Sequence, residues 1–132
     1  MNEAIPVLIV DDDTSIQGIV EEILIENGFQ PTIASSGEEA IRLFDENTYR
    51  AIIIDISLGR DGVKGWSIAR RARAFNPILP VIYITGGNSD DWAVEGVPNS
   101  ILLTKPFVPS QLVTAVSQLL NAAAGSDGFV AA

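Results

Sequence analysis

The sequence contains neither cysteine nor histidine. Without cysteine the chain can form no disulfide and no thiolate metal site, and the expected location is the cytoplasm. Without histidine it can supply no Ser-His or Cys-His catalysis, no histidine-zinc site and no phosphohistidine of its own. Any chemistry must therefore use carboxylates, hydroxyls, lysine and a hard metal ion.

Basic residues and long apolar runs are also scarce. The 132 residues include 17 acidic and 8 basic ones, a net charge of −9, which disfavours binding to nucleic acid or to an anionic membrane. No apolar run approaches the roughly 20 residues that cross a bilayer, and the N-terminus lacks the features of a signal peptide. Hydrophobic residues make up 47% and aromatic residues 7%, which is typical of one globular domain with an aliphatic core.

Apolar segments of strand length alternate with segments of helical periodicity. Strands are expected at residues 5–10, 29–34, 51–55, 80–85 and 100–104. Continuously apolar strands such as AIII and VIYI are typical of a sheet that is covered on both faces. The alternation therefore predicts an α/β fold with a doubly wound, five-stranded parallel sheet.

The helices are predicted from their apolar faces and their end signals. The face of the first helix is expected to comprise Ile16, Ile19, Val20, Ile23 and Leu24. Gly28 ends that helix, Ser36 and Glu39 form a capping box for the second, and Pro109 opens the last. A third helix is expected at 65–75, whereas the fourth, within about 89–95, should be short or irregular. We expect a domain over 1–123 and a flexible tail over 124–132.

Polar side chains occur where the predicted strands end. These residues are Asp11, Asp12, Asp55, Thr85 and Lys105. In parallel α/β sheets the carboxyl ends of the strands meet at one edge, where ligands bind. Carboxylates held close together repel each other, and Mg²⁺ relieves that repulsion while it binds phosphate oxygens. A carboxylate nucleophile, a lysine and a hydroxyl around such a cation suit phosphoryl transfer to an aspartate.

Each of these residues also has an ordinary structural explanation. Asp13, with Thr14, is assigned to the N-cap of the first helix. Asp55 alone could be a polar strand end, Thr85 a β-branched strand end, and Lys105 a surface lysine. Their joint placement at one edge of the sheet favours the functional interpretation.

The motifs at these positions resemble one known family. VDD (10–12), IDISLG (54–59), ITGG (84–87) and TKPF (104–107) occur in the order and spacing of the receiver (phosphoacceptor) domain of two-component response regulators. The resemblance covers residues 5 to about 122. GWSIARRARAFNP resembles the variety found in bacteria as stand-alone, single-domain proteins or fused behind sensor kinases. The family resemblance implies a flavodoxin-like fold with strand order 2-1-3-4-5.

The resemblance also implies residue roles. Asp55 would accept a phosphoryl group from a sensor histidine kinase or a histidine phosphotransfer protein. The implied Mg²⁺ ligands are Asp11, Asp12, Asp55 and the backbone oxygen of Ser57. Thr85 and Lys105 would contact the phosphoryl group, Gly86 would leave space beside it, and the bond before Pro106 would be cis. Such a domain is no ordinary enzyme, although it promotes its own phosphorylation and slow dephosphorylation.

This chain departs from the family pattern in places that concern switching and docking. Leu102 replaces an aromatic residue three positions before the lysine, so Thr85 and Leu102 are the expected switch residues. The loop after Asp55 is rich in glycine and lacks the usual proline at Gly59. Donor docking is expected at Ser15, Ile16 and Ile19, with burial in the core as the alternative for Ile16 and Ile19. The apolar last helix, with Phe129 and Val130, allows a homodimer without requiring one.

Other interpretations stay open at this point. A pseudo-receiver, which docks partners without phosphorylation, would keep the fold. A Mg²⁺-dependent phosphatase with an aspartyl nucleophile usually has a second acid two residues later, where this chain has Ser57. A flavin-binding protein would need a phosphate-binding Ser/Thr-Gly loop after the first strand, which is missing. The twelve residues after Leu120 are too few for an output domain, and Met1 favours a complete protein, with part of a hybrid kinase as the alternative.

Overall fold

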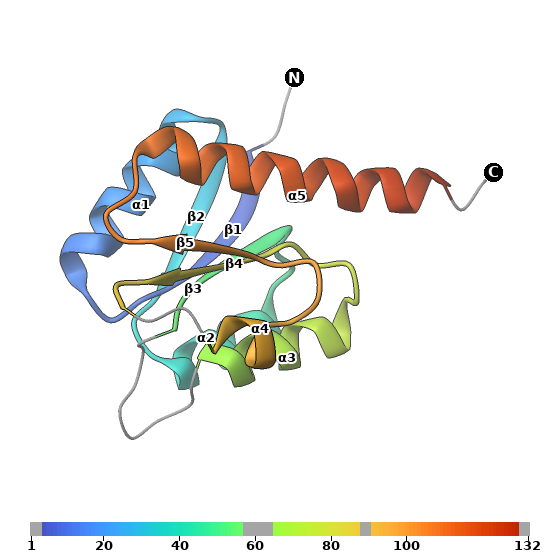
Figure 1. Cartoon of the computed structure of the whole chain (residues 1–132), viewed down its shortest axis with the longest axis horizontal. Coiled ribbons are helices and arrows are strands. Elements are labelled where there is room, and N and C mark those ends of the chain that lie inside the picture. Colours follow the sequence, from blue (N-terminus) through green and yellow to red (C-terminus); the bar gives the residue numbers. More distant parts are fainter. Residues whose placement is uncertain (1–3, 57–64, 88–90, 130–132) are drawn as a thin grey trace.

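The computed structural model describes residues 4–56, 65–87 and 91–129, with side chains to residue 123. Strands and helices alternate along the chain (Figure 1). In order they are β1 (Ile5–Val10), α1 (Thr14–Glu26), β2 (Phe29–Ala34), α2 (Gly37–Glu46), β3 (Ala51–Asp55), α3 (Gly65–Phe75), β4 (Val81–Thr85), α4 (Trp92–Glu95), β5 (Ile101–Thr104) and α5 (Pro109–Phe129). The strands form one parallel sheet in the order β2-β1-β3-β4-β5, which confirms the predicted fold.

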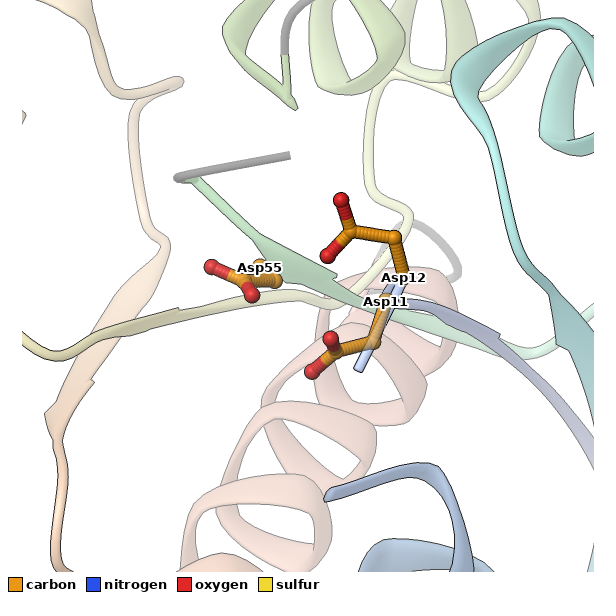
Figure 2. Close-up of side chains that lie close together, drawn as sticks. All are labelled: Asp11, Asp12 and Asp55. Carbon is orange, nitrogen blue, oxygen red and sulfur yellow. The ribbon is translucent and has the colours of Figure 1, made fainter. Parts of the chain in front are cut away.

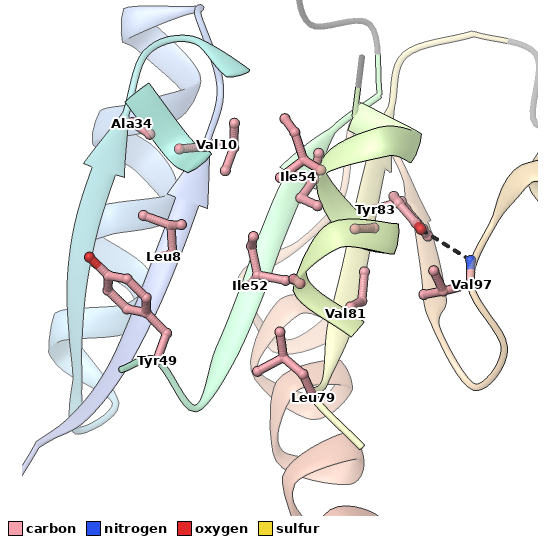
Figure 3. Close-up of a cluster of buried hydrophobic side chains, with 14 residues drawn as sticks. Leu8, Val10, Ala34, Tyr49, Ile52, Ile54, Leu79, Val81, Tyr83 and Val97 are labelled. Atoms are coloured by element: carbon pink, nitrogen blue, oxygen red, sulfur yellow. Dashed lines mark hydrogen bonds between the residues drawn. The ribbon is translucent and has the colours of Figure 1, made fainter. Parts of the chain in front are cut away.

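Helices cover both faces of the sheet. In Figure 1, α1 and α5 lie on one face and α2, α3 and α4 on the other. Each face carries its own apolar cluster: Leu8, Ile52 and Tyr83 belong to the α2–α3 side (Figure 3), and Val7, Ile53 and Leu112 to the α1–α5 side. Every residue of β3 and β4 is buried, because side chains on both faces of these strands meet a helix layer.

The ends of the first two helices follow the predicted signals. Asp13 is the N-cap of α1 and accepts hydrogen bonds from the N–H groups of Ser15 (2.9 Å) and Ile16 (3.4 Å). Gly28, with φ of 87°, follows the end of α1. At α2 the Ser36 hydroxyl accepts from the Glu39 N–H, while the Glu39 carboxylate accepts from the N–H of Ser35. The capping box is therefore present, with its return bond one residue earlier than usual.

The buried face of α1 differs from the prediction at one position. Ile19 is 51% exposed, so its assignment to the buried face is wrong. Ile19 lies about 100° around the helix from Val20, outside the arc that faces the sheet. Gln17 is instead buried beside Val20 and Leu24.

The last two helices differ in length. As predicted, α4 is short, with four residues. The backbone of α5 continues past Ala123 to Phe129, beyond the expected end of the domain. None of the described helices combines the length and the apolar character needed to cross a membrane.

Candidate functional site

Three carboxylates meet at the carboxyl edge of the sheet. Asp11 and Asp12 follow β1, Asp55 ends β3, and these two strands are neighbours with Val10 opposite Ile54. One carboxylate oxygen from each aspartate lies within 4.8 Å of the other two, and Figure 2 shows the three side chains close together. Asp11 is 1% and Asp55 2% exposed, whereas Asp12 is exposed to solvent.

A lysine and a threonine complete this group from the next two strands. Lys105, which follows β5, places its Nζ 3.4 Å from Asp55 Oδ2. Its backbone N–H donates to the Thr85 carbonyl at 2.7 Å, which joins the ends of β4 and β5. Thr85 is 4% exposed, and its hydroxyl accepts a hydrogen bond from the Gly87 N–H at 3.2 Å. The Lys105–Pro106 peptide bond is cis.

Asp11 is the carboxyl group whose protonation the site alters most clearly. Burial raises the pKa of Asp11 from 3.8 to about 6. The Asp13 N–H, which donates to Asp11 Oδ1 at 2.9 Å, opposes this increase, the negative charge of Asp55 adds to it, and Lys105 opposes it. A cation among the three carboxylates would offset the cost of keeping them ionised, and oxygen ligands of this kind suit Mg²⁺. The residues therefore fit that ion.

A pocket of about 360 Å³ adjoins these residues. Its lining consists of Ile56, Trp66, Thr85, Gly86, Gly87, Asp91 and Lys105. The pocket therefore reaches Thr85 and also Lys105, which is paired with Asp55. A Cβ at Gly86 would lie 3.7 Å from Lys105 Cδ, an ordinary contact, so packing in the described residues does not require glycine there.

The remaining predicted site residues lie in three places. Ser57 is outside the described residues. Ser15, Ile16 and Ile19 lie on the first turns of α1, with Ser15 and Ile19 exposed and Ile16 half-buried. Leu102 is half-buried on β5, opposite Tyr83 of β4, and packs against the cluster on the α2–α3 side.

Gln17 was missed in the sequence-based site. Its amide Nε2 donates to the backbone oxygen of Asp11 at 2.5 Å and to the Ser35 hydroxyl at 3.1 Å. The available signal was its spacing, because Gln17 precedes Val20 by three positions and Leu24 by seven, which places it on the buried face.

Known proteins share this fold, and some of them are also similar in sequence. The sequence profile of the response regulator receiver domain matches residues 7–117. A response regulator receiver protein from Sinorhizobium medicae is 41% identical with a TM-score of 0.88, covering 92% of this chain and 98% of that one. The receiver domain of the sensor histidine kinase PA1611 from Pseudomonas aeruginosa, which has a magnesium ion coordinated in its active site cleft, is 24% identical with a TM-score of 0.78, covering 89% of this chain and 98% of that one.

Longer proteins also contain a matching segment. An NtrX-like response regulator from Rickettsia bellii is 33% identical over 111 residues, which are 83% of this chain and 23% of that protein. The chain thus spans about a quarter of the length of the curated relatives it matches.

Proposed function

This chain belongs to the receiver domain family of response regulators, which act in two-component signalling, and we propose that it accepts a phosphoryl group on Asp55. The donor is a phosphohistidine on a sensor histidine kinase or a histidine phosphotransfer protein. An oxygen of Asp55 bonds to phosphorus as the phosphorus–nitrogen bond of the donor breaks, and the imidazole nitrogen keeps the electron pair. The product is an aspartyl phosphate that alters the protein's interactions with partners.

The chain's own groups have separate tasks in this reaction. Asp11, Asp12, Asp55 and the Ser57 carbonyl hold Mg²⁺, which when bound neutralises charge on phosphoryl oxygens. Lys105 exchanges its bond with Asp55 for one with a phosphoryl oxygen, and the Thr85 hydroxyl donates to another. Gly86 has no side chain and therefore leaves space beside the phosphoryl group. These residues promote phosphorylation of the domain and also its dephosphorylation, which is slow. The domain is nevertheless not a classical enzyme.

One observation carries the proposal: the Lys105 ammonium lies 3.4 Å from the aspartate that closes the three-carboxylate group. A cation site alone would not require a lysine on one of its ligands. An acceptor aspartate does, because the phosphoryl group brings further negative charge to the same point.

Recognition of the donor is proposed at the start of α1. Ser15 and Ile19 are exposed, Ile16 is half-buried, and the helix begins directly after the acidic residues. The net charge of −9 agrees with a protein partner rather than nucleic acid or an anionic membrane. We place the protein in the cytoplasm, with homodimer formation through α5 compatible with this role.

Switching is proposed to pass from Thr85 to Leu102. Thr85 lies at the end of β4, and its carbonyl accepts a hydrogen bond from the N–H of Lys105, which follows β5. A movement of Thr85 toward the phosphoryl group would therefore displace the end of β5. Leu102 lies on β5 and packs beside Tyr83, and it would respond through packing because it has no polar group.

The low exposure of Asp55 favours one alternative function. At 2% exposed, this side chain offers little surface to a donor. A pseudo-receiver, which binds partners without being phosphorylated, would not need a more exposed Asp55.

Incubation with acetyl phosphate and Mg²⁺, followed by intact-mass measurement, separates the two functions. The proposal predicts one phosphoryl adduct on the wild type and none on Asp55→Asn or without Mg²⁺. A wild-type protein that binds Mg²⁺ but stays unmodified would contradict the proposal and support the pseudo-receiver instead.

A further inference from the structure

Gln17 is a polar side chain on the buried face of a helix. It is 9% exposed and lies three and seven positions before Val20 and Leu24, which are fully buried on the same face of α1. Burial of a primary amide is costly unless its groups form hydrogen bonds. An apolar residue would fill this part of the core without that requirement, so the bonds that Gln17 makes call for an explanation.

Both of these bonds go to the carboxyl edge of the sheet. The Gln17 amide Nε2 donates to the backbone oxygen of Asp11 (2.5 Å) and to the Ser35 hydroxyl (3.1 Å). Ser35 is held in turn, because its N–H donates to the Glu39 carboxylate at 2.7 Å. Gln17 therefore fastens the end of β1 to the segment that joins β2 to α2.

The bond to Asp11 restrains the peptide group that joins two of the three aspartates. The Asp11 oxygen belongs to the peptide group between Asp11 and Asp12, so fixing it limits rotation on both sides of that group. The Asp11 N–H already donates to the Ala34 oxygen (3.1 Å), and Asp11 Oδ1 accepts from the Asp13 N–H (2.9 Å). Gln17 supplies the remaining restraint on the Asp11 backbone, its carbonyl.

We propose that Gln17 is a positioning residue for the divalent cation, acting through the Asp11–Asp12 peptide group without touching the ion. This inference rests on the proposed function of the three carboxylates. Outer residues that orient metal ligands commonly change metal affinity by about 10- to 100-fold when they are removed. In this protein the residue that orients the metal ligands is Gln17, which lies within helix α1.

The test compares two variants on the buried face of α1 and uses two further variants in support. Gln17→Met keeps the length and burial of the side chain but removes the donor. Val20→Ala removes apolar contacts from the same helix face, lowers stability and leaves the bonds of Gln17 in place. Ser35→Ala removes the second acceptor alone. Gln17→Asn, which keeps an amide but shortens its reach, replaces the methionine variant should that protein not fold.

Two measurements are made on the full chain. The first is the ¹⁵N–¹H resonance of the Asp12 amide without metal, which reports hydrogen bonding at the Asp11 carbonyl. The second is the Kd for Mg²⁺ by calorimetry. Gln17→Met should shift the Asp12 resonance and raise Kd by about tenfold or more. Val20→Ala should change neither, and Ser35→Ala should have a smaller effect than Gln17→Met.

Results that differ from these expectations would overturn the inference. An unchanged Kd in Gln17→Met, with or without a shifted Asp12 resonance, would show that the bond does not serve the cation. An equal rise in Val20→Ala would assign the effect to general loss of stability. Failure of the wild type to bind Mg²⁺ would remove the proposed function as well, so the two failures can be distinguished.

Discussion

Lys105 and Asp55 face each other across 3.4 Å between Nζ and Oδ2, although they are fifty residues apart in sequence. Asp55 is the last residue of β3 and Lys105 follows β5, so the pair bridges over the end of β4. The bridge sets the ammonium group beside the aspartate where negative charge would increase on phosphorylation.

Lys105→Gln should slow the reaction with acetyl phosphate by about 100-fold, the usual loss when one positioned donor to a developing charge is removed. The rate is measured by intact mass against time at saturating Mg²⁺. Arg42→Gln, which removes one positive charge from an exposed position on α2, is the matched control and should leave the rate unchanged. Equal rates in the wild type and Lys105→Gln would remove Lys105 from the site.

Neighbouring aspartates should give opposite results. Asp12→Ala should raise the Kd for Mg²⁺ by more than about tenfold, because a ligand matters more than the outer partners whose loss already has that effect. Asp13→Ala should leave Kd unchanged and lower the free energy of unfolding by about 1 kcal/mol, because Asp13 caps α1. Calorimetry and urea denaturation check the pair. Equal losses of Mg²⁺ affinity would mean that the two residues have been assigned incorrectly.

Stability without metal should depend on pH through Asp11. Its pKa is raised by burial to about 6 from 3.8, so the folded state holds this proton more tightly than the unfolded state. The contribution to stability is therefore complete below about pH 4 and is lost as pH rises to about 6, a loss of up to about 3 kcal/mol. Asp11→Asn has no such proton, and at pH 7.5 it should be more stable than the wild type by about 1–3 kcal/mol.

Urea denaturation in EDTA at several pH values measures this difference, which should shrink toward pH 4. Added Mg²⁺ should restore stability in the wild type more than in Asp11→Asn. An Asp11→Asn protein that is less stable than the wild type at pH 7.5 would contradict the predicted cost of ionised Asp11.

A buried tyrosine holds the segment between α4 and β5. The Tyr83 hydroxyl accepts a hydrogen bond from the Val97 N–H at 3.1 Å (Figure 3), and its ring packs edge-on against Trp66 at 4.8 Å between centroids. Burial also raises the pKa of Tyr83, so the hydroxyl stays neutral. This bond ties the chain after α4 to the centre of the sheet.

Tyr83→Phe should lower the free energy of unfolding by about 1–3 kcal/mol, because the buried Val97 N–H would lose its acceptor. Tyr49→Phe is the control in the same cluster, since its hydroxyl forms no hydrogen bond within the described residues, and it should change stability by less than about 0.5 kcal/mol. Chemical denaturation measures both. Equal losses would mean that the Tyr83 bond contributes nothing of its own.

The strands and the acidic group could be predicted because their signals are local. A continuous apolar run such as residues 51–55 marks a strand covered on both faces, and a polar residue at its end lies at the carboxyl edge whatever the loops do. Asp11, Asp12, Asp55, Thr85 and Lys105 are therefore brought together by strand order and register.

The helix details could not be predicted because they depend on contacts between distant segments. The spacing of Gln17 places it on the buried face of α1, but its hydrogen-bond partners, the Asp11 carbonyl and the Ser35 hydroxyl, follow only from the fold. Likewise, the short length of α4 was predicted, but the bonds that hold it, from Trp92 to Ser100 and from Arg70 to Glu95, were not. Residues 124–132 were expected to form a flexible tail because they lie at a chain end, yet the backbone of α5 continues to Phe129.

Chemical location of the phosphoryl group tests the account most directly. Borohydride reduces an acyl phosphate to an alcohol, so phosphorylated Asp55 would become homoserine. After incubation with acetyl phosphate and Mg²⁺, reduction and tandem mass spectrometry, we predict homoserine at position 55 and unchanged aspartate at positions 11 and 12. Homoserine at either of those positions, or none at position 55, would contradict the assignment of Asp55 as the acceptor.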